Sequence, residues 1–505
     1  MIEQLTILLV VIPLVLAPIT ALFKSHKIVW SVTLFVSVSC LILSSIILID
    51  VIDGKHVIYE LGGWRPPWGI EYKIDSLNAF IALIVSAIAC VATIFALQSV
   101  PREISKTNFG YFYASFQLCL LGLLGIALTG DIFNLFVFLE ISSLSSYALI
   151  SMGRSRKALT AAFSYLVLGT IGATFFLIGV GFLYAASGSL NIADIAARFS
   201  EFEDMQLVMT GFIFIILGLG LKAAIFPMHS WLPNAYSHAP SVVSIFLSAT
   251  ATKVSLYALL RVLFDLYPLA YWQAFLLPQI LLVLGCVAVI YGSYRAWQQI
   301  ELKRLLAFSS VAQVGYIVIG ISLLNNDGLT AAVMHLFNHA IIKATLFMGA
   351  GIILFRANTT MLSELRGFGG SMPWTFAAIC LAGLSLIGVP GTVGFVTKWY
   401  LLSSAVSEGK WIVVAAIVIG SVLAIAYVWK IVEAMYFNSK RKMVIQNVRS
   451  GDIRVAKAPM SLSIALWIGA IACLYFGLYT EIPYQSAQSI AEALLNTPAI
   501  GGSGL

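Results

Sequence analysis

Long apolar runs follow one another along almost the whole sequence, with short polar segments between them. A run of about 20 predominantly apolar residues crosses the hydrocarbon core of a bilayer as one helix. Fourteen runs approach or reach this length, at residues 4–22, 28–50, 77–98, 110–129, 131–151, 159–185, 208–226, 241–264, 272–293, 304–323, 328–355, 374–405, 411–436 and 458–479. The pattern predicts an all-α polytopic membrane protein with about 14 transmembrane helices.

These helices are expected to form a single transmembrane domain over residues 1–505. The longest loops, 51–76, 186–207 and 437–457, are too short to hold a catalytic domain. Within the domain we distinguish three N-terminal helices, two groups of five helices, and a last helix with a short tail. These parts occupy residues 1–98, 110–264, 272–436 and 458–505.

The two groups of five helices contain similar sequences. The run LTAAFSYLVLGTIGATFFLIGVG begins at Leu159, and LTAAVMHLFNHAIIKATLFMGAG begins at Leu329. Further along, Lys222 and Lys398 correspond at nearly the same spacing. Helices 4–8 and 9–13 are therefore predicted to be two copies of one unit. Because five is odd, successive copies cross the membrane in opposite directions, which is the inverted repeat found in many transporters.

Two of the predicted helices contain helix-breaking residues. Helix 7 is followed by a polar segment that includes Pro227, Pro233 and Pro240, and helix 12 contains Pro390 between two glycines. A helix break at membrane depth persists only where protein or a water-filled cavity receives the freed backbone groups. We therefore expect helices 7 and 12 to be broken, close to a hydrated path.

Composition supports the assignment as a membrane protein and argues against a soluble domain, a nucleic-acid-binding protein and a metal or redox protein. The sequence is 60% hydrophobic and 10% charged with a mean hydropathy of +0.97, whereas soluble domains carry about 25% charged residues. The net charge of +7 does not indicate a nucleic-acid partner, because basic residues in membrane proteins mainly set orientation. The six cysteines lie within apolar runs and form no CxxC pair, so we expect no metal, no redox cofactor and no catalytic redox site.

Charged loop residues alternate in sign along the chain. Acidic residues concentrate in one set of loops, at Asp50, Asp53, Glu60, Glu71, Asp75, Asp194, Glu201, Glu203 and Asp204. Basic residues concentrate in the other set, at Lys24, Lys27, Arg102, Lys106, Arg154, Arg156, Lys157, Arg295, Lys303, Arg304, Arg356, Arg366, Lys440, Arg441 and Lys442. Since basic loops remain in the cytoplasm, we expect a bacterial inner-membrane protein with both termini on the periplasmic or external side.

Few ionisable residues lie deep in the predicted spans. Glu140 follows Asp131 by nine residues, which is about 13 Å along a helix, and Lys222 and Lys253 lie on either side of the break after helix 7. A lysine in hydrocarbon costs roughly 2.5–3.5 kcal/mol on insertion scales. These side chains are therefore candidates for proton transfer. The alternatives are lysines that snorkel to the interface and a glutamate that is only a structural partner.

Helices 11 and 12 hold further candidates. His335, His339 and Lys343 recur every four residues, so they share one helix face, and Lys398 follows Pro390 by eight residues. Two histidines four residues apart also suit a metal, but no HExxH glutamate or cysteine lies nearby. We expect a proton relay, because burial disfavours the charged form of an amine whereas a nearby carboxylate favours it, and histidine titrates near neutral pH.

Five segments together resemble the antiporter-like subunits of Mrp cation/proton antiporters, respiratory complex I and membrane-bound hydrogenases. They are GDIFNLFVFLEISSLSSYALI, LKAAIFPMHSWLPNAYSHAPSVVSIFLSATATK, KRLLAFSSVAQVGY, HLFNHAIIKATLFM and GVPGTVGFVTKWY. The first segment and Lys398 are most similar to the D subunits of Mrp-type antiporters. The GVPGTVGF form of helix 12 departs from the GIPP form of those subunits, and Gln313 stands where some relatives have histidine.

The resemblance implies 14 core helices with inverted five-helix repeats. It also implies that Glu140 and Lys222 form a pair between helices 5 and 7, and that Lys253, His335 and His339 relay protons toward Lys398. The implied function is that of a membrane subunit of a multisubunit Na⁺/proton antiporter, with other membrane subunits, protons and monovalent cations as partners. Three alternatives remain open: a proton-pumping subunit of a redox complex, a transmembrane partner in inorganic-carbon uptake, and a scaffold that only anchors other subunits.

Overall fold

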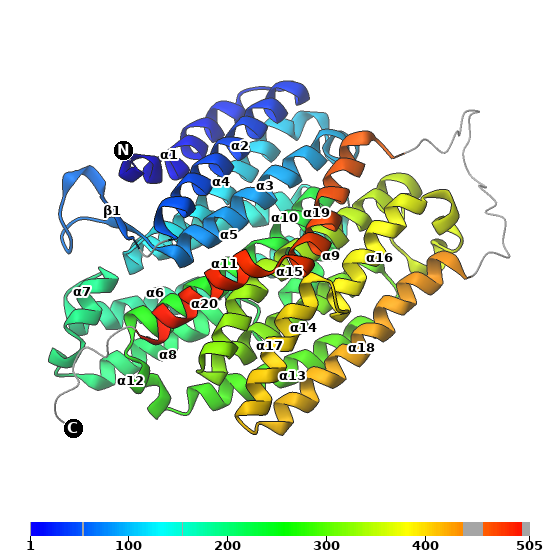
Figure 1. The fold of residues 1–505 in the computed structure, drawn as a ribbon. Coiled ribbons are helices and arrows are strands. Elements are labelled where there is room, and N and C mark those ends of the chain that lie inside the picture. Colours follow the sequence, from blue (N-terminus) through cyan, green and yellow to red (C-terminus); the bar gives the residue numbers. More distant parts are fainter. Residues whose placement is uncertain (1, 53–54, 154, 438–457, 497–505) are drawn as a thin grey trace.

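The computed structural model describes residues 2–52, 55–153, 155–437 and 458–496, and nearly all of them are helical. The helices of the N-terminal half are α1 Ile2–Ala21, α2 His26–Val51, α3 Ser76–Glu103, α4 Phe109–Leu128, α5 Ile132–Ser151, α6 Arg156–Ser187, α7 Ile192–Ala197, α8 Met205–Lys222, α9 Trp231–His238, α10 Ser241–Ala249 and α11 Ala251–Arg261. They form an elongated bundle whose long helices run side by side (Figure 1).

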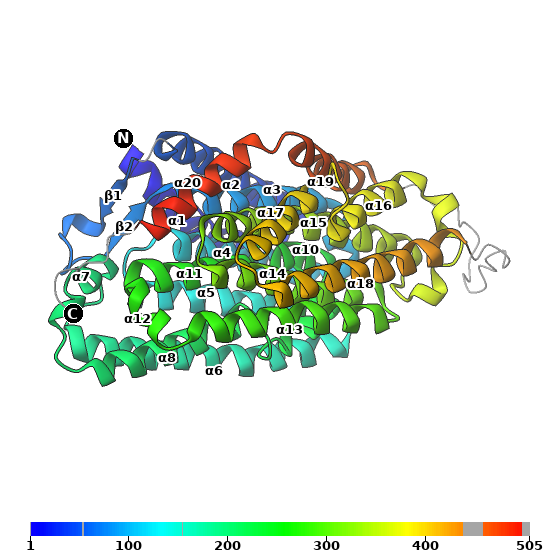
Figure 2. The same ribbon diagram turned by 60° about the horizontal axis from the view of Figure 1, so that its bottom comes forward.

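The second half continues the same bundle. Its helices are α12 Leu269–Ala274, α13 Leu277–Gln298, α14 Leu302–Leu323, α15 Asn326–Ala357, α16 Pro373–Ile387, α17 Val393–Ser407, α18 Trp411–Tyr436, α19 Met460–Leu478 and α20 Glu481–Leu495. Figure 2 shows α6, α8 and α13 along one side of the bundle and α19 and α20 along the opposite side. α14 lies inside, and its spanning segment is completely covered by other helices.

The predicted polytopic all-α architecture is confirmed. Thirteen helical segments of the described chain are long and apolar enough to cross a membrane. The fourteenth expected span, 374–405, is present as the two shorter helices α16 and α17. The prediction of a break in helix 12 is therefore correct, and α8 likewise ends at Lys222 before the short helix α9 begins. The inverted relation between the two five-helix units stays a prediction.

A third break was not anticipated from the sequence. The expected continuous helix over 241–264 is divided into α10 and α11 at Thr250, whose φ of −121° and ψ of −56° are not helical. The Thr250 hydroxyl donates a hydrogen bond to the carbonyl oxygen of Phe246 at 2.6 Å. Such bonds from threonine to the carbonyl four residues earlier bend helices, and this one places the break three residues before Lys253.

The loop after α2 also differs from the expectation of an all-helical chain. β1 Val57–Glu60 and β2 Glu71–Ile74 form an antiparallel hairpin, in which Val57 pairs with Ile74 and Glu60 with Glu71. The hairpin lies at one end of the bundle (Figure 1). It is too small to change the fold class.

The hairpin end of the bundle gathers the acidic loops. The backbone N–H of Gly130 donates to the carbonyl oxygen of Glu71 at 2.9 Å, and the Asn191 side chain donates to the Glu71 carboxylate at 2.7 Å. These bonds join the loops 51–76 and 186–207. The loops around 300 and 360 pair with each other at the other end, where Leu302 N–H donates to the Thr360 carbonyl oxygen at 2.8 Å.

The acidic loops 51–76 and 186–207 therefore lie together at one end of the bundle, and the loops around 300 and 360 lie together at the other. Which end faces the cytoplasm stays a prediction. Asp53, Arg154, Lys440, Arg441 and Lys442 contributed to the charge pattern but lie outside the described residues.

Candidate proton-transfer site

Lys222 and Glu140 form a buried ion pair. Lys222 is the last residue of α8, and its Nζ donates to Glu140 Oε1 of α5 at 3.0 Å and to Ser143 Oγ at 2.6 Å. The Lys222 side chain is 4% exposed and that of Glu140 is 22% exposed. The predicted pair between helices 5 and 7 is therefore in place, because the end of α8 brings the amine to the middle of α5.

The break after α8 leaves backbone groups that the surrounding side chains satisfy. The indole N–H of Trp231 donates to the carbonyl oxygen of Leu221 at 3.0 Å, and the Trp231 ring stacks on Tyr165 at 3.9 Å between ring centroids. A cavity of about 10 Å³ adjoins Lys222, Ser143 and Ser255. That volume has room for about one water molecule, so the amine can be hydrated from the direction of α11.

Lys253 lies at the break between α10 and α11. Its Nζ donates to the carbonyl oxygen of Ser248 and, at 3.4 Å, to Thr252 Oγ1, and the residue is 1% exposed. The carbonyl groups at a helix C-terminus carry a partial negative charge that favours a cation. The end of α10 therefore provides a polar site for this amine within the apolar core.

α15 carries three of the predicted residues on one face. His335 Nε2 lies 2.9 Å from Gln313 Oε1 of α14, and the rings of His335 and His339 are nearly parallel with centroids 5.7 Å apart. Lys343 Nζ donates to the Leu306 carbonyl oxygen at 2.8 Å and to Ser309 Oγ at 2.5 Å.

The two histidines lie among the buried amines. The charges of Lys253 and Lys343 act on His339, and those of Lys398, Lys253 and Lys343 act on His335. Neither ring nitrogen of His339 has a hydrogen-bond partner among the described residues.

Lys398 of α17 occupies the corresponding place in the second half of the chain. Its Nζ donates to the carbonyl oxygens of Leu386 at 3.2 Å and Ile387 at 2.7 Å, which end α16, and to Ser421 Oγ at 3.2 Å. The same atom lies 5.1 Å from the centroid of the Tyr316 ring, which also contacts His335. Tyr316 thus lies between the histidine pair and the terminal lysine.

The structure excludes snorkelling to the interface for these lysines within the described chain. Lys222, Lys253, Lys343 and Lys398 are all at most 8% exposed. Of the four, only Lys222 has a carboxylate partner in an ion pair between described residues. Lys253, His335, His339, Lys343 and Lys398 therefore lie together in one buried array. The Lys222–Glu140 pair, which holds the carboxylate, borders a cavity that Ser255 of α11 also lines.

Several polar residues that contact these side chains were not singled out from the sequence. Ser143, Ser309 and Ser421 each accept a hydrogen bond from a buried lysine. Gln313, where the sequence left a relay in doubt, contacts His335 directly. Neutral polar residues are common in membrane helices, so nothing in their spacing distinguished them. The described residues hold no group of three or more His, Cys, Asp or Glu side chains suited to a metal.

Arg261, at the end of α11, forms a second buried ion cluster near the hairpin. Its guanidinium contacts the Asp75 carboxylate at 2.5 Å and the Asp265 carboxylate at 2.7 Å, and its Nε donates to Tyr257 OH at 3.0 Å. Burial acts to raise the pKa of Asp75, but the adjacent guanidinium and hydrogen bonds hold that pKa below its ordinary value. This cluster joins α11 to the start of α3.

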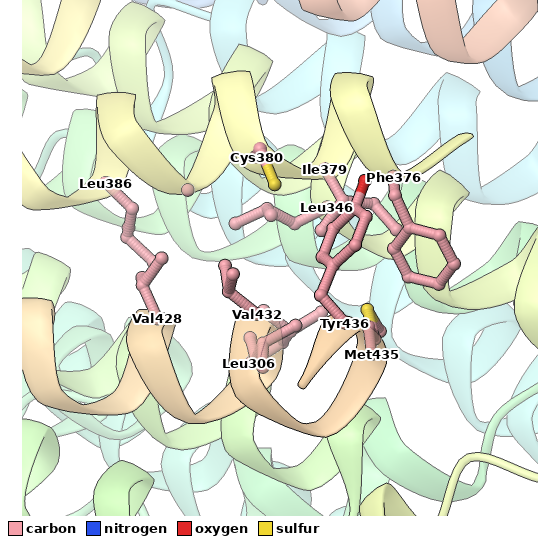
Figure 3. A pocket seen from close by; sticks show the side chains of 12 residues that line it. Leu306, Leu346, Phe376, Ile379, Cys380, Leu386, Val428, Val432, Met435 and Tyr436 are labelled. Atoms are coloured by element: carbon pink, nitrogen blue, oxygen red, sulfur yellow. The ribbon is translucent and has the colours of Figure 1, made fainter. Parts of the chain in front are cut away.

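An apolar pocket lies between α16 and α18 (Figure 3). It has a volume of about 10 Å³, and its lining includes Phe376, Ile379 and Val428. Aliphatic and aromatic side chains provide no ligand for an ion. This pocket therefore offers no site for an ion.

The order of these residues along the chain matches a known family. Residues 129–424, which include Glu140 and Lys398, match the family described as NADH:quinone oxidoreductase/Mrp antiporter, transmembrane. The chain belongs to this family. The predicted resemblance to antiporter-like subunits is thereby confirmed.

Two curated members of the family match nearly the whole chain. The N subunit of the NADH-quinone oxidoreductase of Desulforudis audaxviator is 38% identical over 95% of this chain and 97% of its own length. The D subunit of the Na⁺/H⁺ antiporter of Alkalihalophilus pseudofirmus is 28% identical over 98% of both chains. Family members with either name are therefore similar to this chain from end to end.

Solved structures show the same fold. A chain of an archaeal membrane-bound sulfane sulfur reductase superposes with a TM-score of 0.89 at 30% identity, covering 97% of this chain and 98% of that one. A chain of the Mrp complex from Dietzia sp. superposes with a TM-score of 0.88 at 24% identity, covering 99% and 98%. Both neighbours come from multisubunit membrane complexes, so this chain is an antiporter-like membrane subunit.

Proposed function

We propose that the chain conducts protons within a multisubunit monovalent cation (Na⁺)/proton antiporter. One observation supports this most strongly: Lys222, paired with Glu140, borders a cavity that Ala251 and Ser255 also line, and these residues lie two positions before and after Lys253 on α11. From Lys253, buried imidazoles and amines continue to Lys398. Buried ionisable groups are costly in a membrane and are retained where ions or protons move. A chain that only anchored other subunits would have no need for such an array.

Glu140 controls the proton affinity of Lys222 in this proposal. At an effective dielectric constant of about 20, a unit charge 4 Å away contributes about 4 kcal/mol, which corresponds to roughly a thousandfold change in proton affinity. When Glu140 is ionised and close, Lys222 holds its proton. When Glu140 moves away or is neutralised, Lys222 releases the proton toward Lys253.

The remaining groups carry the proton onward. Lys253 receives it at the break between α10 and α11, and His339 and His335 pass it along one face of α15. Lys343 exchanges protons with the same histidines, and Lys398 is the last acceptor in the chain. Each amine is bonded to a backbone carbonyl or a serine hydroxyl, so its position is held in both protonation states.

The same proposal specifies the partner subunits, the membrane orientation and the transported ions. Other membrane subunits of the complex contact its outer helices, and the basic end of the bundle faces the cytoplasm of a bacterial cell. The acidic hairpin end and both termini then face the periplasm or the exterior. Protons and monovalent cations are the transported ions.

A proton-pumping subunit of a redox complex is the second candidate. It is favoured by the 38% identity to the N subunit of an NADH-quinone oxidoreductase over 95% of the chain and by the fold shared with the sulfane sulfur reductase chain. The proton path would be the same in both cases. The difference lies in the energy source, which is an ion gradient for an antiporter and electron transfer in partner subunits for a redox pump.

Purification of the intact complex tests the proposal. We expect a complex without flavin or iron–sulfur absorbance that, in proteoliposomes, acidifies or alkalinises the lumen when a Na⁺ gradient is imposed. Glu140→Ala should abolish this response, and Glu433→Ala, a glutamate on the exposed face of α18, is the matched control. Flavin and iron–sulfur subunits in a complex that does not respond to Na⁺ would establish the second candidate. Wild-type transport by Glu140→Ala would refute both.

A further inference from the structure

Lys303 is a buried amine to which the proposed path assigns no role. It is the second residue of α14, and its place beside Arg304 in a basic loop suggested a surface position. Instead it is 2% exposed, and its Nζ donates to the carbonyl oxygen of Ala239, where α9 ends, at 3.0 Å. Ser244 Oγ of α10 lies 3.5 Å from the same nitrogen.

Two helices connect Lys303 with the interior amines. Along α14, the Leu306 carbonyl oxygen lies about one turn after Lys303 and Ser309 nearly two turns after it, and both accept hydrogen bonds from Lys343. Along α10, Ser244 is followed one turn later by Ser248, whose carbonyl oxygen accepts from Lys253. One helical turn rises about 5.4 Å. The nearest binding group of Lys343 is therefore about one turn from Lys303, and that of Lys253 is about one turn from Ser244, which Lys303 contacts.

A carboxylate connects Lys303 with the basic end of the bundle. Glu103, the last residue of α3, is half-buried, and its Oε2 accepts a hydrogen bond from the backbone N–H of Ser241 at 2.7 Å. Ser241 lies between Ala239 and Ser244, the two residues that Lys303 contacts, so Glu103 and Lys303 bind the same turn between α9 and α10 without a direct ion pair. The charges of Glu103 and Glu301 both favour the ammonium form of Lys303.

The half-buried His238 at the end of α9 belongs to the same group of charged residues. Lys303, Lys157 and Arg304 all act on it electrostatically. Titratable groups thus continue from Lys303 to the surface at the basic end.

We propose that Lys303 exchanges protons between Glu103 at the basic end and the amines of Lys343 and Lys253 inside. The carboxylic acid of Glu103 gives its proton to the neutral amine of Lys303, which leaves a carboxylate and an ammonium. The ammonium then donates a proton to Ser244 Oγ while that hydroxyl releases its own proton, which crosses the remaining helical turn by way of water to an interior amine, and Lys303 becomes neutral again. This inference rests on the proposed function, because Lys303 and Glu103 would form the entrance to the same proton path at the basic end of the bundle.

A purely structural role for Lys303 makes a different prediction. If the side chain only ties the end of α9 to α14, an arginine would preserve the positive charge and the bond to the Ala239 carbonyl oxygen. Arginine does not release its proton in proteins, so it cannot exchange one. Lys303→Arg therefore distinguishes two roles of Lys303: proton exchange, which arginine cannot perform, and the structural bond between α9 and α14, which arginine can preserve.

The test uses the assembled complex in proteoliposomes with a pH-sensitive dye in the lumen. We expect Lys303→Arg and Lys303→Met to lower proton flux by about tenfold or more, a modest value for one proton-transfer group. Glu103→Gln keeps the acceptor for Ser241 N–H but carries no proton, and should lower the flux severalfold. Arg304→Met, which removes a neighbouring cation, is the control and should keep the wild-type rate.

An assembled Lys303→Arg complex with wild-type flux would overturn the inference. If the Lys303 variants do not assemble, Glu103→Gln tests the inference in their place. Unchanged proton flux in Glu103→Gln would also overturn the inference. Glu140→Ala, measured in the same assay, distinguishes rejection of the Lys303 role from rejection of proton conduction by this chain. Loss of flux in Glu140→Ala together with wild-type flux in Lys303→Arg rejects only the role of Lys303.

Discussion

Each buried amine in this protein is held by a backbone carbonyl, a serine or a carboxylate, and the type of partner distinguishes their roles. Lys222 has a carboxylate, Glu140, whereas Lys253 and Lys398 lie at the carbonyl ends of interrupted helices. A carboxylate that moves changes the proton affinity of an amine strongly, whereas fixed carbonyl dipoles provide a constant environment. In the proposed mechanism, this difference assigns control of the proton to Lys222 and its passage to the other amines.

The proton flux of a His335 variant tests whether this single residue carries protons along the proposed path. We expect His335→Ala to slow proton flux by roughly 100-fold, the lower end of the range for a single proton-transfer group. Transfer should not stop completely, because water can enter the space left by the ring. His56, an exposed histidine near the hairpin, provides the matched control. Unchanged flux in reconstituted His335→Ala complexes would remove His335 from the path.

Helix interruptions determine where these amines lie. α8 ends at Lys222, α10 ends four residues before Lys253, and α16 ends at the carbonyl group that Lys398 contacts. The sequence predicted the first and third interruptions because proline and glycine mark them. Thr250 gave no such signal, since a threonine within an apolar run is compatible with a continuous helix. Its effect depends on a hydrogen bond to Phe246 that only the folded backbone shows.

The Arg261 cluster holds the end of α11 against α3 and supports a prediction about stability. Arg261→Met leaves Asp75 and Asp265 without their common cation, and removal of one partner from a buried pair costs about 3–5 kcal/mol. We expect a clear decrease in the apparent Tm of the detergent-solubilised complex. Arg198→Met removes a more exposed pair with Asp194, worth at most about 1 kcal/mol, and should change Tm little. Equal decreases would contradict the structural role of Arg261.

On the scale of the whole molecule, the proposed path crosses both halves of the chain through the central helices. α14 and α15 bring Gln313, His335 and Lys343 between the Lys222 region and Lys398. Hydropathy predicted the fold because spanning helices must be apolar over a defined length. It also identified Glu140 and the buried lysines, since a charge within an apolar run is conspicuous.

The parts that sequence analysis missed have a common physical origin. Lys303 stands at the start of a helix beside Arg304, where basic residues usually mark the membrane surface, and its burial arises from α9 and α10 folding over it. The β-hairpin is short, and its pairing depends on the loops around Gly130 and Asn191. Both features are produced by contacts between segments far apart in the chain, which local patterns do not contain.

The central claim is that Glu140 and Lys222 act as one unit, and a double-mutant cycle on proton flux tests it most directly. Glu140→Gln, Lys222→Met and the double variant are assembled into the complex and reconstituted, and proton flux is measured at one pH. Residues that act as a unit show strongly non-additive losses. We predict that each single variant loses nearly all flux and that the double variant loses no more. Wild-type flux in either single variant, or partial losses that multiply in the double variant, would contradict the account.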